Sequence, residues 1–155
     1  MPDNVNLTAS SASSTMHTYL LYEDNGTWKK LIDIKDYPAM GGSPETVDTT
    51  TLSQEVSTFV TGVQTLDAFE FLANFTAADF NKVKTLQDSA QVYKFALAFG
   101  KPDGTAYGSL GVFTWNGQVS TWVEGGSVNG VREMRISVSA TSEVSFSQET
   151  LTVTA

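Results

Sequence analysis

Residues 41–65, GGSPETVDTTTLSQEVSTFVTGVQT, give the strongest indication of how this chain is built. The opening Gly-Gly-Ser-Pro suits neither a helix nor a central strand, because proline lacks a backbone donor and glycine has no side chain to pack. β-branched runs at 46–51 and 56–61 flank a polar centre, and all the charges are acidic. Loops of this length are usually functional or disordered. We therefore predict a long projecting β-hairpin that becomes ordered against another molecule.

The charge distribution restricts the classes of partner. The 155 residues are enough for one domain with a real core, and the net charge is −8. Between Lys35 and Lys82 there are seven carboxylates and no basic residue. Duplex binding needs Lys and Arg to neutralise phosphates, so this surface favours solubility, or repulsion of polyanions, over nucleic-acid binding. The absence of cysteine excludes disulfides and thiolate sites, and no stretch approaches transmembrane length.

The N-terminal part divides into an arm and a hairpin. Residues 1–15 are rich in Ser and Thr and have too little apolar content to pack alone. We predict a flexible arm there, or one ordered by a neighbouring subunit, followed by a single β-domain over 16–155. Residues 17–23 and 27–34 read as strands joined by Asp24-Asn25-Gly26, a strong hairpin signal.

A strand and the one expected helix follow the long loop. Residues 67–75 alternate, which predicts a strand with Phe69, Phe71, Ala73 and Phe75 on its core face. A helix is predicted over 77–87, with Thr76 as N-cap and Phe75 and Phe80 as a hydrophobic staple. The side chains expected to pack this helix on the sheet are Phe80, Val83, Leu86 and Ala90.

Further strands complete the chain. We predict strands at 91–99, at 107–115 and 119–124 around a two-residue Asn116-Gly117 hairpin, at 131–140, and in broken form at 144–154. The fold class is therefore mainly β: an antiparallel sandwich or barrel with one flanking helix and the long projecting hairpin.

The residues that usually carry chemistry are few. His17 is the only histidine, which argues against both a catalytic base and a zinc site. Asp67 and Glu70 are three apart on a strand and point to opposite faces. No phosphate-binding loop, dinucleotide fingerprint or nucleophile elbow occurs. Three tryptophans raise the alternative of a sugar platform, but Trp115 is expected in the core, which leaves Trp122 as an exposed interface residue. We expect no catalytic, cofactor or metal site.

Residues 40–52, MGGSPETVDTTTL, are similar to the "GG-PE-hydrophobic-D-x-T-T-L" signature of the major tail proteins of long-tailed bacteriophages. Residues 59–65 followed by Phe69-Glu70-Phe71 resemble the continuation of that pattern, and the helix falls where the family places its one helix. The Ser/Thr-rich N-terminal arm departs from it. The resemblance covers about residues 19–140.

This resemblance implies a tail tube protein. Six copies would close into a ring, and rings would stack into a tube around a tape measure protein, with a tail terminator at its end. DNA would later pass through without specific binding, and no cofactor or membrane would be involved. The protein would reside in the virion tail after assembly in the host cytoplasm. The long loop would fold against an adjacent subunit through these residues: Gly41, Gly42, Pro44, Glu45, Asp48, Thr50, Leu52, Phe59 and Gly62.

A tube also needs a lining. An acidic, lysine-poor surface suits DNA that must slide without sticking. Outward residues Glu70, Glu124 and Glu133 are the candidates. Arg132 and Arg135 lie near Glu133 in the sequence and would neutralise it or pair across subunits. Related tubes of contractile tails and secretion systems stay open as alternatives. So does a monomeric β-sandwich that binds a carbohydrate or a protein, and, more remotely, an enzyme.

Overall fold

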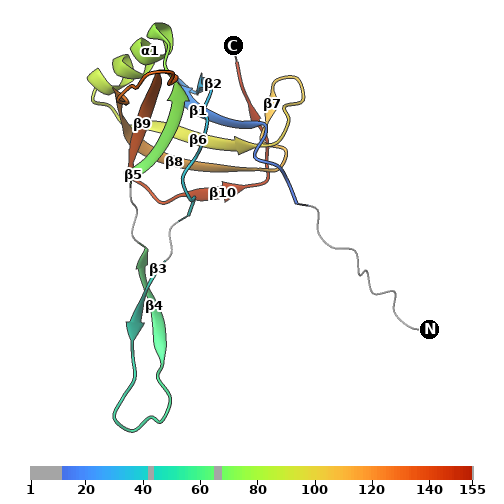
Figure 1. The fold of residues 1–155 in the computed structure, drawn as a ribbon. Helices are drawn as coiled ribbons and strands as arrows, with labels where there is room; N and C mark the ends of the chain where they lie inside the picture. The colour runs from blue at the N-terminus through green and yellow to red at the C-terminus, as the bar shows by residue number, and fades with distance from the viewer. Residues whose placement is uncertain (1–11, 42–43, 65–67, 155) are drawn as a thin grey trace, which may run out of the picture.

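The computed structural model describes residues 12–41, 44–64 and 68–154, and it is built mainly from antiparallel β-strands (Figure 1). The predicted arm falls outside the described residues for positions 1–11. The main sheet has its strands in the order β2 (Thr27–Ile32), β1 (Thr18–Asp24), β6 (Tyr93–Phe99), β8 (Gly111–Val123), β9 (Glu133–Ala140) and β5 (Ala68–Asn74). The short β10 (Ser145–Ser147) pairs with the first part of β8.

Strand β8 holds the sheet together because it changes partners along its length. Residues 111–117 pair with β6, and residues 117–123 pair with β9, so that Gly117 pairs with both neighbours. In Figure 1, β1 and β6 run at a steep angle to β5 and β9. The sheet therefore curls around one core without closing into a barrel.

The predicted Asn116-Gly117 hairpin is wrong, because β8 runs straight through these residues. A Cβ atom on Gly117 would lie 2.7 Å from the carbonyl oxygen of Ser139. The glycine is thus required by the close approach of β9 and not by a turn. By contrast, the predicted turn at Asn25-Gly26 is confirmed: both residues have positive φ and connect β1 to β2.

The core lies on the inner face of the curled sheet. Trp115 is 2% exposed and packs among Phe69, Phe71 and Phe95, with ring centroids 5.2–6.3 Å apart. The predicted inward residues of β5, Phe69, Phe71 and Ala73, are buried there as expected, together with Met134 and Ile136 of β9. A second, smaller cluster covers the outer face of β1 and β6 beneath the ribbon of β7 (Ala106–Tyr107) and β11 (Leu151–Thr152). The outer face of β5 and β9 has no such cover among the described residues.

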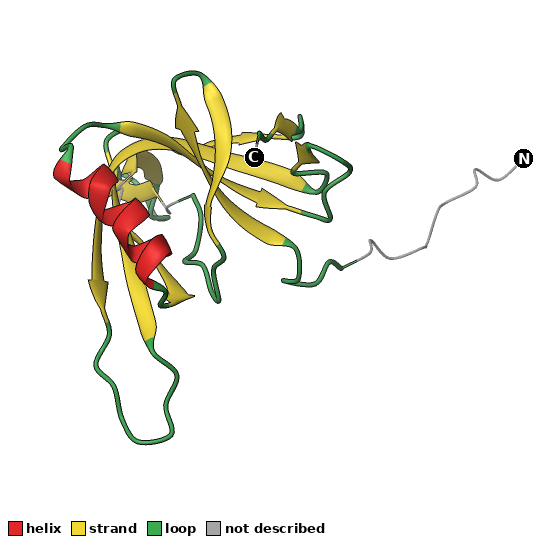
Figure 2. Ribbon diagram, turned by 90° about the horizontal axis from the view of Figure 1, so that it is seen from above, coloured by secondary structure: helices red, strands yellow, loops and turns green. Residues whose placement is uncertain are grey.

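The predicted helix is confirmed as α1 (Ala77–Asp88), which lies beside the strands in Figure 2. The Thr76 hydroxyl accepts a hydrogen bond from the Asp79 N–H at 3.2 Å, and Val83 is fully buried. Ala90, however, is exposed: it follows the end of the helix with φ 55° and does not pack on the sheet.

The long loop forms the predicted hairpin. Strands β3 (Pro44–Asp48) and β4 (Phe59–Gln64) pair antiparallel, with Val47 opposite Val60. The strands begin and end several residues away from the predicted runs, which leaves residues 49–58 as the tip. Figure 1 shows the hairpin projecting clear of the sheet.

Candidate interaction surfaces

The hairpin carries apolar side chains that are exposed in the part of the chain that the structure describes. Thirteen large apolar side chains are exposed among the described residues, and five of them lie on this one element. Leu52, at the tip, is fully exposed. No hydrogen bond, ion pair or aromatic contact joins residues 46–62 to the rest of the described chain. The five exposed side chains are Val47, Leu52, Val56, Phe59 and Val60.

The tip is nevertheless well defined, because its polar groups bond to one another. The Thr58 N–H donates to the Thr50 hydroxyl at 2.8 Å, and the Thr51 N–H donates to the Gln54 side chain at 2.7 Å. The hydroxyls of Thr49 and Thr58 lie 3.0 Å apart. These bonds give the tip a fixed shape and leave its apolar side chains pointing outward.

The predicted inter-subunit residues are spread over the whole hairpin. Gly41 forms an exposed bend ahead of β3, whereas Gly42 lies outside the described residues. Pro44, Glu45 and Asp48 belong to β3, Thr50 and Leu52 to the tip, and Phe59 and Gly62 to β4. The Thr50 side chain and its backbone N–H together hold the pKa of Asp48 below its ordinary value, so this carboxylate is charged at neutral pH.

A polar surface covers the outer face of β5, β9 and the end of β8. Leu72 of β5 pairs with Arg135 of β9, which in turn pairs with Trp122 of β8. The Arg135 guanidinium lies 2.7 Å from Glu124 and 3.6 Å from Glu70. Its hydrogen bond to Glu124 holds the pKa of that carboxyl below its ordinary value.

The third predicted lining residue, Glu133, lies on the same face. Its carboxylate is 2.7 Å from the Lys35 ammonium, which comes from the segment after β2. Sequence reasoning associated Glu133 with the neighbouring arginines, but Arg135 pairs with the other two carboxylates instead. The structure thus brings together all three predicted carboxylates, and two cations partly neutralise them.

A second exposed apolar region, which the sequence did not predict, lies at the β8–β9 connection (residues 124–132). Val123, Val128 and Val131 are exposed beside a pocket of about 550 Å³. The connection is held at its base by the Glu124 N–H, which donates to the Glu133 carbonyl at 3.0 Å. Arg132 lies on its rim and makes no ion pair with the described residues. Three single valines in a glycine-rich stretch give no periodic pattern from which such a surface could be predicted.

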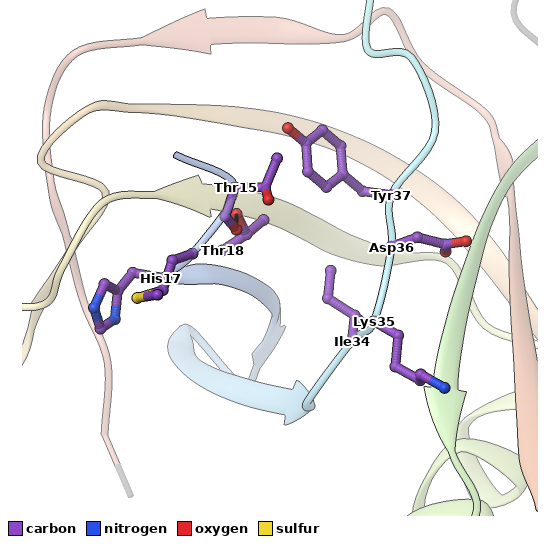
Figure 3. A pocket seen from close by; sticks show the side chains of 8 residues that line it. Thr15, His17, Thr18, Ile34, Lys35, Asp36 and Tyr37 are labelled. Atoms are coloured by element: carbon purple, nitrogen blue, oxygen red, sulfur yellow. Dashed lines mark hydrogen bonds between the residues drawn. The ribbon is translucent and has the colours of Figure 1, made fainter. Parts of the chain in front are cut away.

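A pocket of about 560 Å³ lies between the start of β1 and residues 34–37 (Figure 3). Its polar groups diverge: His17 and Lys35 point away from each other at opposite sides. The His17 ring contacts the Tyr19 hydroxyl at 3.2 Å, and the Asp36 carboxylate accepts the Leu72 N–H at 2.9 Å. These polar groups are already engaged and do not converge on a common point.

No group of three potential metal-ligating side chains occurs among the described residues. The tryptophans form no platform, since Trp115 is buried, Trp28 packs in the outer cluster, and the Trp122 indole N–H donates to Glu124 at 3.1 Å. Within the same residues, no helix has both the length and the apolar character needed to cross a membrane.

No protein-family model and no curated protein sequence matches the chain. Solved structures do match. A chain from the tail of an empty GTA particle, solved with helical refinement and C6 symmetry, aligns with a TM-score of 0.66 at 17% identity, covering 88% of this chain and 99% of that one. The sheath/tube terminator of PVC, an extracellular contractile injection system in its extended state, aligns with a TM-score of 0.68 at 12% identity, covering 90% and 99%. The chain has the tail tube fold.

A type six secretion system protein aligns more distantly, with a TM-score of 0.50 at 12% identity and coverage of 83% and 81%. The tail tube fold implied by residues 40–52 is therefore confirmed, including its mainly antiparallel β architecture, single helix and projecting hairpin. At these identities the similarity is one of fold, and it spans phage-like tails, injection systems and secretion systems alike.

Proposed function

We propose that this protein is the tube subunit of a phage-like tail, and that its copies form rings that stack into a hollow tube. The projecting hairpin carries this proposal, because its five exposed apolar side chains have no partner among the described residues of their own chain. Exposed apolar surface of this kind marks an interaction site. The tail of the GTA particle, which contains a chain of the same fold, has C6 symmetry. Rings of six are the arrangement that we propose here.

The polar face of β5 and β9 is our candidate for the lumen lining. Glu70, Glu124 and Glu133 share this face with Arg135 and Lys35, so its net charge is slightly negative. A smooth lining of paired charges would offer DNA phosphates little to bind. In this proposal the tape measure protein occupies the lumen during assembly, a terminator closes the tube, and DNA passes through later.

The location follows from the same proposal. A tube subunit resides in the tail of the virion, and its assembly takes place in the host cytoplasm.

Electron microscopy of the purified protein tests the proposed function. We expect rings or tubes with a central channel. A chain that stays monomeric at high concentration would support the monomeric binding module instead. A variant lacking residues 47–58 should fold but form no tubes, and unimpaired polymerisation of that variant would contradict the role of the hairpin.

The lumen assignment has its own test. Glu70→Lys reverses an exposed charge whose contact with Arg135 is the longer of the two. Particles built from this variant should assemble and then deliver DNA more slowly, because the new ammonium attracts phosphates. Glu149→Lys, at an exposed site near the C-terminus, is the matched control. Equal delivery rates for both variants would place Glu70 outside the lumen.

A further inference from the structure

The hairpin and the β8–β9 connection lie at opposite ends of the domain. Residue Ala68, where β5 begins after the hairpin, pairs with Ser139 at the end of β9. Asn74, where β5 ends, pairs with Glu133 at the start of β9, immediately after the connection. The two features are thus separated by the full length of β5, roughly 20 Å. Figure 1 shows the hairpin pointing away from the α1 end, so it does not fold back onto its own connection.

These two regions together hold most of the exposed apolar side chains. Five of the thirteen lie on the hairpin, and four more lie at or beside the connection: Trp122, Val123, Val128 and Val131. The connection also encloses a pocket of about 550 Å³, which is large enough for a branched aliphatic side chain. Leu52 and Val56 are the apolar side chains that the tip presents. The tip therefore presents exposed apolar side chains, and the connection presents a pocket that could take them.

The two regions also offer one complementary pair of charges, because Glu124, which lines the pocket too, is already paired with Arg135 at 2.7 Å. Glu55 lies between Leu52 and Val56 in the exposed tip and makes no ion pair among the described residues. Arg132 on the pocket rim likewise makes none. Arg132 is thus a cation without an ion pair among the described residues, and it lines the same pocket as three valines. Complementary charges at an interface fix its register and speed the encounter.

Both regions are already formed in the single subunit. The tip is held by the bonds around Thr50 and Gln54. The connection is held by the Gly130 N–H, which donates to the Ser127 carbonyl, and by the Arg132 carbonyl, which accepts the Phe75 N–H. Association of preformed surfaces loses less conformational entropy than coupled folding does.

We propose that the hairpin tip of one subunit docks into the β8–β9 connection of a second copy, with Leu52 and Val56 in the pocket and Glu55 paired to Arg132. This inference rests on the proposed tube function and identifies the contact between successive copies. The contact is head-to-tail, and such contacts generate either closed rings or open stacks, depending on the rotation between copies. At about 3.3 Å per residue, the hairpin reaches about 30 Å from its base to Glu55, which exceeds the length of β5.

A charge swap tests the pairing. Glu55→Arg and Arg132→Glu should each raise the critical concentration for tube growth about tenfold, because each places like charges together at the interface. The double variant should restore growth to within about threefold of the original. Glu149→Arg and Lys101→Glu change the same charges at exposed sites elsewhere and should have no effect. Sedimentation and electron microscopy give the readout, and thermal unfolding checks that every variant is folded.

Disulfide trapping gives a second test. The chain contains no cysteine, so a new pair reports only its own proximity. A chain carrying Val56→Cys and Val128→Cys should form a ladder of linked subunits under mild oxidation, whereas Val56→Cys with Val92→Cys, also exposed, should not. Suppose that the original protein forms tubes, but the double charge-swap variant does not regain growth and no disulfide ladder forms. This docking mode is then wrong and the proposed function stands. If the original protein never forms tubes, both proposals fail.

Discussion

Gly117 is the residue at which β8 passes from one partner strand to the other. A Cβ atom there would meet the Ser139 carbonyl oxygen and a Val138 methyl group, both at 2.7 Å. Gly117→Ala should lower the free energy of unfolding by about 1–3 kcal/mol, the usual cost of overpacking. Urea unfolding at low protein concentration measures the change.

Gly125→Ala provides the control, because a Cβ atom at Gly125 would meet nothing within 4 Å. Equal urea midpoints for the two variants would contradict the role assigned to Gly117.

The pH dependence of the free energy of unfolding should include a contribution from the Glu124 carboxylate. Because its hydrogen bond with Arg135 lowers the pKa in the folded state, the charged form favours folding at pH values above the ordinary pKa of about 4.5. That contribution disappears as the pH falls through the lowered folded-state pKa. The melting temperature of Glu124→Gln should therefore lie below that of the original protein by a constant amount at neutral pH, and the gap should narrow in acid, below about pH 4.

The exposed Glu149→Gln serves as the comparison for this pH series. A gap between the original protein and Glu124→Gln that stays the same at every pH would show that the Arg135 contact does not lower the pKa of Glu124.

At the scale of elements, α1 supplies a hydrogen-bond acceptor to the part of β8 that does not pair with β6. The Gln87 side chain accepts the Thr121 N–H at 3.0 Å, and Thr121 is 8% exposed. Gln87→Met keeps the side-chain length but removes the acceptor. We expect it to cost about 1–2 kcal/mol of stability, since a buried N–H is left without a partner. Gln91→Met, at an exposed position, should cost almost nothing, and an equal loss at both sites would contradict this function of α1.

Elements defined by local patterns could be predicted from the sequence. The alternation of β5 and the Thr76 cap of α1 depend on neighbours within a few residues, and both are confirmed. The Asn116-Gly117 pair gave a wrong turn prediction, because the glycine is required by the close approach of Ser139, which is distant in the chain. Likewise, the pairing of Glu133 with Lys35 joins residues 98 positions apart, so no local pattern contains it. The β-branched runs of residues 41–65 predicted the hairpin, and the family resemblance agreed, but the surface at residues 124–132 exists only through its folded arrangement.

At the scale of the whole molecule, stability should depend on protein concentration. Any partner that binds only the folded state raises the melting temperature by mass action. The original protein should therefore melt at a higher temperature as its concentration increases into the range of tube growth. A variant with residues 49–58 replaced by Asn-Gly should melt at one temperature throughout. Differential scanning calorimetry over a hundredfold dilution series measures both, and a flat response from the original protein would contradict self-assembly through the hairpin.

The placement of the hairpin at one end of β5 only has a consequence for any filament of these subunits. With the proposed docking, such a filament would be directional: its leading end would display free tips that carry Leu52 and Val56, and its trailing end would display unoccupied β8–β9 pockets. Proteins that bind the two ends of the filament would then have to differ in shape. A protein at the leading end would need a pocket for the tips, and a protein at the trailing end would need a tip for the pockets. Free subunits would add to the two ends through different surfaces, and two filaments meeting tip to tip could not fuse.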